Sequence, residues 1–416
     1  MRKITFKQDG KIYYGWWQVL VGFLLMSFAY VGFISVTSVF VLPVTAEFAC
    51  ERSEFMLYST ILCLVSVVAA AFMGKRMAKG NIKLIMLVNA LIAGVGYFGF
   101  SRSNSLWQIY VFAAILGIPF TCLTTMPISI LLNNWFGGKI KGTAMGLAFL
   151  GSGVGGMVLT PALNYVNTTF GWRVGYLTLA AIFVFFLAPI ILLLVVKTPA
   201  EKGQTRVGET ASESNTTEAK GMYINDAKKS PMLWLTSLAI FIAVVGSSGI
   251  LANSVAFFVE CNFSATTAAS VAGLMLGSLT LGKPLVGMVC DKFGVQKGSI
   301  LSFSTFSLCF FSLFLMTQYK MLVVLVILFY AFGCAAVTIC PPLLTSYLFG
   351  EKDYGAIIGI FTMATNIGGA FGGTVAAKIF DMTGSYGSFW LVSGVCIALS
   401  VILCLISFKI RKKYHY

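Results

Sequence analysis

Long apolar runs separated by short polar stretches dominate the chain. Twelve of these runs reach about 20 residues or more, the length that an α-helix needs to cross the hydrocarbon core of a bilayer. They lie near residues 16–46, 54–74, 82–101, 106–132, 140–167, 173–196, 232–259, 266–290, 298–318, 321–348, 354–380 and 386–408. The pattern therefore predicts an all-α integral membrane protein with twelve transmembrane helices.

The polar stretch between the sixth and seventh runs differs from the other connections. Residues 197–231 are rich in Ser, Thr, Glu and Lys and carry few large apolar side chains. Such a composition cannot bury enough apolar surface to fold, so we expect a disordered cytoplasmic linker. It separates an N-terminal six-helix half, residues 1–196, from a C-terminal six-helix half, residues 232–416.

The two halves repeat one another in their glycine positions. A shift of 213 residues superimposes seven glycine pairs: Gly74 on Gly287, Gly137 on Gly350, Gly142 on Gly355, Gly146 on Gly359, Gly155 on Gly368, Gly156 on Gly369 and Gly171 on Gly384. Two pseudo-symmetric six-helix halves, related by an axis along the membrane normal, form the plan of the major facilitator fold, with the substrate held between them. The repeat therefore predicts a carrier.

The balance of charge fixes the expected orientation. Hydrophobic residues make up 58% of the chain and charged residues 10%, with 29 Lys and Arg against 14 Asp and Glu. Lys and Arg collect on the cytoplasmic side of membrane proteins. With the N-terminus inside, cytoplasmic segments hold 23 basic residues and external loops hold five. We therefore expect both termini in the cytoplasm of a plasma membrane protein, and the net charge of +15 is explained without a nucleic acid partner.

Several classes of enzyme and cofactor site are excluded. The only histidine is His415, next to the C-terminus, which leaves none for a catalytic triad or a proton relay. The ten cysteines form no CxxC pair, and no GxxxxGK[ST] motif occurs, so neither a metal centre nor direct drive by ATP is expected. We predict no cofactor, no metal and no enzymatic activity.

One polar turn carries a motif. The residues Gly287, Asp291, Lys292, Gly294 and Lys297 resemble the signature G-x-x-x-D-R/K-x-G-x-x-K/R of the major facilitator superfamily. Glycines allow a tight turn and close helix approach, while an Asp beside a helix end can hold the halves in one state.

The first copy of this motif is incomplete. It keeps Gly74 and Lys79 but has Ala78 in place of the acid. A gate that depends on that carboxylate is therefore weaker or absent in the N-terminal half.

Further segments are similar to the branch of oxalate/formate antiporters and monocarboxylate porters. They are Tyr13 to Trp17, Trp135 and Phe136, the glycine-rich stretch from Gly142 through Pro161, and Gly171 to Arg173. Glycines spaced four apart let helices pack closely, and for most of them packing alone is the simpler explanation.

Lys283 is the sharpest candidate for substrate contact. The resemblance implies that this position of the eighth helix carries an Arg that pairs with the substrate carboxylate, and here a Lys replaces it. Burying an ammonium in a membrane helix costs at least about 2.5 kcal/mol, so a binding partner is expected. The alternative is that Lys283 extends its side chain toward the cytoplasmic interface.

At three other positions the chain differs from the residues that the resembling carriers have there. Ser35 stands where animal monocarboxylate porters carry a Lys, Leu279 where they carry an Asp, and a neutral residue near Thr365 where oxalate carriers carry a Lys. One buried cation favours a monoanion over oxalate. No Asp, Glu or His lies deep in any predicted helix to relay protons. The remaining candidates for lining the substrate cavity are Tyr30, Asn366, Tyr330, Ser35, Thr124 and Thr365.

Together these features predict a monomeric secondary active transporter. It moves a small organic anion of monocarboxylate type by alternating access, through anion exchange or proton-linked symport. Two alternatives stay open: a carrier or efflux pump for a neutral or lipophilic solute, and a membrane sensor that does not transport. The lipid bilayer and the anion are the expected partners.

Overall fold

The computed structural model describes residues 7–8, 11–207 and 220–414. Within these residues, twelve helical segments are long and apolar enough to cross a membrane. They are Gly15–Phe48, Glu54–Lys79, Ile82–Arg102, Leu106–Trp135, Lys141–Phe170, Trp172–Leu194, Pro231–Glu260, Thr266–Phe293, Val295–Met316, Lys320–Phe349, Tyr354–Thr383 and Gly387–Arg411. The prediction of a twelve-helix membrane fold is confirmed. His415 lies outside the described residues.

Eight of the twelve spans consist of one long helix each. These are α4 (Arg52–Lys79), α5 (Ile82–Arg102), α8 (Lys141–Phe170), α12 (Pro231–Glu260), α13 (Ala265–Phe293), α14 (Val295–Met316), α16 (Tyr354–Thr383) and α17 (Gly387–Arg411). A ninth span consists of α15 (Val323–Phe349) after the short turn η6 (Lys320–Leu322).

The other three spans are interrupted. The first comprises α1 (Gly15–Leu25), η1 (Met26–Tyr30), α2 (Val31–Phe33), η2 (Ser35–Thr37) and α3 (Ser38–Phe48). The fourth comprises α6 (Leu106–Leu123) and α7 (Thr125–Trp135), and the sixth α9 (Trp172–Ala181), η4 (Ile182–Leu187) and α10 (Ala188–Leu194). Outside the spans lie β1 (Lys7–Gln8), β2 (Lys11–Ile12), η3 (Gly138–Ile140), η5 (Pro199–Lys202) and α11 (Ile224–Lys229).

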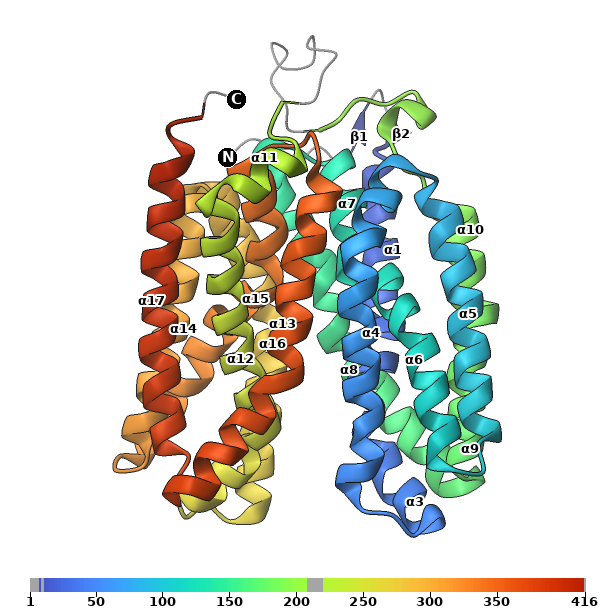
Figure 1. Ribbon diagram of the computed structural model, residues 1–416, viewed down its shortest axis with the longest axis vertical. Coiled ribbons are helices and arrows are strands. Elements are labelled where there is room, and N and C mark those ends of the chain that lie inside the picture. Colours follow the sequence, from blue (N-terminus) through green and yellow to red (C-terminus); the bar gives the residue numbers. More distant parts are fainter. Residues whose placement is uncertain (1–6, 9–10, 208–219, 415–416) are drawn as a thin grey trace. The chain divides into compact units, whose positions relative to one another are not determined.

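The chain forms two compact units. Unit 1 comprises Met1–Gly138 and Leu147–Glu209, and unit 2 comprises Lys139–Gly146 and Thr210–Tyr416. The first six residues of α8 therefore belong to unit 2, and the rest of that helix to unit 1. In unit 1 the helices α4 and α5 pack on α6, and in unit 2 α12 packs on α16 and α15 packs on α13 and α14 (Figure 1).

Local sequence explains where many of the helices begin and end. Asn81 accepts a hydrogen bond from the Leu84 N–H at the start of α5, and Ser264 accepts one from Thr267 at the start of α13. Such caps satisfy backbone donors that the first turn leaves without partners. Gly171 and Gly384, one of the repeated pairs, have φ of 87° and 73°, a conformation that favours glycine.

The repeat extends to an acidic residue at the end of the first helix of each half. In unit 1, Glu47 accepts hydrogen bonds from the Trp172 indole and the Arg173 guanidinium. In unit 2, Glu260 lies 213 residues further on and accepts bonds from Ser385 and the Tyr386 N–H. Each carboxylate thus joins the end of one helix to the start of another, at equivalent places in the repeat.

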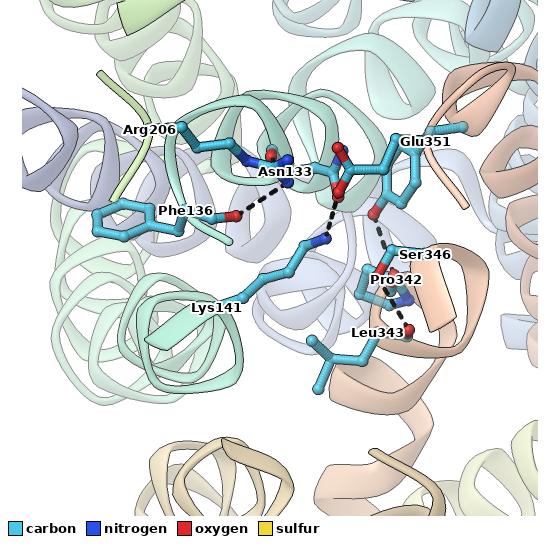
Figure 2. Close-up of polar contacts among 9 residues, drawn as sticks. Asn133, Phe136, Lys141, Arg206, Pro342, Leu343, Ser346 and Glu351 are labelled. Atoms are coloured by element: carbon cyan, nitrogen blue, oxygen red, sulfur yellow. Dashed lines mark hydrogen bonds and ion pairs between the residues drawn. The ribbon is translucent and has the colours of Figure 1, made fainter. Parts of the chain in front are cut away.

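The described ends of the predicted linker are ordered. At one end the Gly137 N–H donates to the Val207 carbonyl at 2.8 Å, and the Arg206 guanidinium donates to the Phe136 carbonyl at 3.3 Å (Figure 2). At the other end the Met222 N–H donates to the Phe349 carbonyl at 2.8 Å.

These contacts correct part of the predicted disorder of residues 197–231. The stretch also contains η5 and α11, so its described parts have regular structure, because backbone groups of the neighbouring loops pair with it. The rest of the predicted linker, residues 208–219, lies outside the described residues.

Two adjacent glycines of α8 provide a matched test of helix packing. A Cβ atom at Gly155 would overlap the Ser27 carbonyl group of η1, whereas a Cβ at Gly156 would meet nothing within 4 Å. We expect Gly155→Ala to destabilise the protein by about 1–3 kcal/mol through overpacking. Gly156→Ala is expected to be neutral or stabilising by up to about 1 kcal/mol, because alanine favours the helix.

The measurement is the melting temperature of each purified variant in detergent. A lower melting temperature for Gly155→Ala alone supports the close packing of α8 on the first span. Equal melting temperatures for the two variants would contradict it.

Candidate functional site

Lys283 lies in the interior of α13, ten residues before the end of the span. Only 5% of the surface of Lys283 is exposed to solvent. The neighbouring Gly282 lets α13 approach α15 closely, since a Cβ there would overlap the Ala331 carbonyl oxygen. On another side a Cβ at Gly146 would come within 2.7 Å of the Lys283 carbonyl oxygen. Two close backbone contacts therefore fix the position of this lysine.

Polar side chains from two other helices lie beside this position. The turn of α15 that Gly282 approaches at Ala331 also carries Tyr330 and Cys334. The Cys334 thiol lies 3.1 Å from the Ser247 hydroxyl of α12. Tyr330 is buried one turn before Cys334 on α15. We call these four residues the Lys283 cluster.

Tyr330 is thus a predicted residue that the structure brings close to Lys283. Cys334 and Ser247 were not among the predicted residues. Free cysteine behaves as a small apolar residue in sequence patterns, so Cys334 is hidden in an apolar run. Its spacing of four residues from Tyr330, which puts both on one helix face, was the available signal.

Three further candidates lie in unit 1 where helices depart from regular α geometry. Tyr30 ends the π-helical segment η1, and Ser35 begins the 3₁₀ turn η2. Thr124 stands at the break between α6 and α7, with φ −108° and ψ −130°. Such irregular turns inside long helices are frequent at functional sites. Tyr30 and Thr124 both lie beside Phe120, whose ring centroid is 6.5 Å from that of Tyr30 and whose carbonyl accepts from the Thr124 hydroxyl at 2.6 Å.

The last two candidates, Thr365 and Asn366, are half-buried on α16. The Thr365 hydroxyl donates to the Phe361 carbonyl of its own helix at 2.9 Å. Thr365 and Asn366 keep their predicted roles as proposals.

Asp291 of the signature motif binds the start of α8. Its carboxylate accepts from the Gly142 N–H at 2.8 Å, the Thr143 N–H at 2.6 Å and the Thr143 hydroxyl at 2.6 Å. Gly142 and Gly287 allow this approach, because a Cβ at either residue would overlap the backbone of the other. An anion at a helix N-terminus satisfies donors that lack partners and interacts favourably with the helix dipole.

An ion pair between a buried lysine and a half-buried glutamate lies on the same short segment. The Lys141 ammonium is 3.5 Å from the Glu351 carboxylate, which follows α15 in the chain (Figure 2). The same ammonium lies 5.7 Å from the ring centroid of Tyr354, the first residue of α16. Residues 141–143 of α8 are therefore held by two charged groups of unit 2, Asp291 in the last turn of α13 and Glu351 in the connection after α15.

The remaining motif residues have simpler surroundings. Gly294 has φ of 89° and starts the turn into α14, which explains the glycine. Lys292 and Lys297 are exposed, as is Lys79, whereas Gly74 is buried in α4. In the incomplete first copy of the motif, Lys197 donates to the Gly80 carbonyl at 2.9 Å.

The chain is similar to known transporters along nearly its whole length. The model of the Major Facilitator Superfamily matches residues 22–281 and 257–415. Monocarboxylate transporter 4 of Gallus gallus is 25% identical over 410 residues, which cover 96% of this chain and 84% of that protein. Monocarboxylate transporter 2 of Mus musculus is 23% identical over 405 residues, which cover 93% of this chain and 82% of that protein.

A solved structure has the same fold. The proton:xylose symporter XylE aligns with a TM-score of 0.74 at 15% identity, covering 94% of each chain. The twelve spans, the signature turn and these similarities agree. The chain belongs to the Major Facilitator Superfamily, in its monocarboxylate porter branch, and is a multi-pass membrane transporter of small solutes rather than an enzyme.

Proposed function

We propose that this protein carries a small monocarboxylate across the plasma membrane by alternating access, with Lys283 as the cation that binds the carboxylate. The observation that carries the proposal is the burial of an ammonium-bearing side chain in the middle of a membrane span. A charged group at that depth is costly and marks a substrate or ion pathway in membrane proteins. A carboxylate is the natural ligand for it.

The surroundings of Lys283 support a small anion. The Ser247 and Tyr330 hydroxyls and the Cys334 thiol supply hydrogen-bonding groups within the same cluster. A lysine offers a point charge with three rotatable donors, which suits one carboxylate in several orientations. The relatives bear the name monocarboxylate transporter, which agrees with this ligand.

The Asp291 contact supports a gate for this cycle. The contact joins the last turn of α13 to the first turn of α8, and both of these turns lie in unit 2. We propose that this bond holds one state of the transport cycle and breaks in the other. Both termini would lie in the cytoplasm, on the same side as this turn.

Counterflow in proteoliposomes tests the function. Vesicles are loaded with unlabelled formate, acetate, lactate, pyruvate or oxalate, and uptake of the same labelled acid is followed. We expect accelerated uptake of at least one monocarboxylate and little exchange of oxalate, since Lys283 is the single buried cation in the interior of the described spans and matches one carboxylate. If no acid exchanges faster than in protein-free vesicles, the anion proposal fails, and a carrier of neutral or lipophilic solutes or a sensor takes its place.

A further inference from the structure

We infer that residues 220–229, at the end of the linker, form a strap that positions Glu351 for its ion pair with Lys141. The strap thereby controls how firmly the start of α8 is held, which makes the linker a regulator of the transport cycle. This inference rests on the proposed function and adds its regulation. The strap, Glu351 and Lys141 all lie in unit 2.

Backbone hydrogen bonds join the strap to the connection between α15 and α16. The Met222 N–H donates to the Phe349 carbonyl at 2.8 Å. The N–H of Glu351 itself donates to the Lys220 carbonyl, also at 2.8 Å. The strap therefore holds the backbone of the residue whose side chain pairs with Lys141.

Two glycines allow this pairing. Gly221 of the strap lies opposite Gly350 of the connection, and both have positive φ, of 141° and 74°. A Cβ atom at Gly221 would lie 2.5 Å from the Phe349 carbonyl oxygen, and one at Gly350 would lie 2.4 Å from the Lys220 carbonyl oxygen. A side chain at either glycine would therefore push the strap away from the connection.

Side chains that follow Glu351 also contact the strap. The buried Asp353 carboxylate accepts a hydrogen bond from the Ile224 N–H at 2.9 Å. The Lys352 ammonium lies 4.1 Å from the ring centroid of Tyr223. Three successive residues of the connection, 351–353, are thus in contact with the strap, and their conformation depends on it.

The same connection holds the start of α8. The Glu351 carboxylate lies 3.5 Å from the Lys141 ammonium, and these side chains are 31% and 7% exposed (Figure 2). The chain passes from unit 2 to unit 1 after Gly146 of α8, and it returns to unit 2 within the linker. Both segments in which the chain changes unit therefore contact the α15–α16 connection.

The other end of the linker contacts the equivalent turn of unit 1. There the Gly137 N–H donates to the Val207 carbonyl, and Gly137 is the repeat partner of Gly350. Each turn lies directly before the fifth span of its half, α8 or α16. A connection that only joined the two halves would not need to bind the same turn in both. The repeated contact therefore supports a role of the linker in the cycle.

Acetylation of Lys141 reports the ion pair independently of transport. The purified protein in detergent is treated briefly with an acetylating ester, and each lysine is quantified by mass spectrometry, with the exposed Lys297 as internal standard. A paired, buried ammonium reacts slowly because acetylation needs the neutral amine. The variants are Glu351→Gln, which removes the pair directly, and Gly221→Ala, which displaces the strap. Gly203→Ala is the matched control, since Gly203 is a linker glycine with positive φ but has nothing within 4 Å of an added Cβ.

We expect Glu351→Gln and Gly221→Ala each to raise the acetylation of Lys141 by at least about threefold, and Gly203→Ala to leave it unchanged. The maximal rate of counterflow should fall by about threefold in each of the first two variants. The double variant should be no slower than either single one, because both substitutions act through the same pair.

The outcomes separate the inference from the proposed function. Parental acetylation of Lys141 in Glu351→Gln or in Gly221→Ala would overturn the inference, and so would a double variant whose loss of rate is the product of the two single losses. If Gly221→Ala is not monodisperse, Asp353→Ala, which removes the acceptor of the Ile224 bond, is measured with the same expectations. A parent that exchanges no acid would overturn the proposed function, while the acetylation of Lys141 would still decide the role of the strap.

Discussion

Replacing Lys283 with glutamine is expected to reduce carboxylate counterflow by at least about a hundredfold. Glutamine keeps much of the length and polarity of the side chain but removes the charge that binds the anion. Removing one partner of a buried ion pair costs about 3–5 kcal/mol, and about 1.4 kcal/mol corresponds to a factor of ten. The assay is the counterflow experiment, with equal amounts of each variant in the vesicles.

Lys378→Gln is the matched control for this experiment. Lys378 is exposed on α16, in the same unit as Lys283, and its replacement removes one positive charge from the chain in the same way. We expect parental counterflow from this variant. If Lys283→Gln also exchanges the acid at the parental rate, Lys283 has a structural role only. Solutes without a carboxylate are then tested as substrates.

Asp291→Asn is expected to lower the maximal rate of counterflow by about tenfold. The Asp291 carboxylate accepts three hydrogen bonds from Gly142 and Thr143, and hydrogen bonds to a charged group contribute about 1.5–3 kcal/mol each. An amide has a single acceptor oxygen, and its NH₂ group would face a backbone N–H. Loss of even one such bond shifts the equilibrium between the two states of the transport cycle by about tenfold or more. One step of the transport cycle therefore slows.

Lys292→Gln provides the control for the gate. Lys292 follows Asp291 directly but is exposed, with its ammonium 5.2 Å from the ring centroid of Phe293. We expect the Lys292→Gln variant to show a counterflow rate close to that of the parent protein. The maximal rate is obtained from the dependence of counterflow on acid concentration. Parental rates for Asp291→Asn would show that the bonds to α8 do not control the cycle.

The sequence predicted the fold well because hydropathy alone decides which segments cross a bilayer. The observed spans differ from the predicted ones mainly in length. For example, α4 continues to Lys79, beyond the apolar run, because Arg76 and Lys79 are favourable in the last turn of a helix. Breaks within spans, such as η1 and the turn at Thr124, leave no comparable mark in hydropathy and could not be predicted.

The site was predictable in part. The motif indicated that Asp291 lies beside a helix end, but only the structure identifies the helix as α8, since the partners are backbone groups. In the same way, the pairing of Val207 with Gly137 depends on backbone atoms that any residue carries. Lys283 stood out in sequence as a charge within an apolar run, whereas its neighbour Cys334 did not.

Equilibrium binding tests the central claim most directly, because it separates ligand recognition from movement. Formate, acetate, lactate and pyruvate are titrated calorimetrically into the purified parent protein, Lys283→Gln and Lys283→Arg, each shown to be monodisperse in detergent. We predict that at least one acid binds to the parent and to Lys283→Arg and that the same acid does not bind measurably to Lys283→Gln. Equal binding of that acid to the parent and to Lys283→Gln would contradict the role of Lys283 as the carboxylate-binding cation.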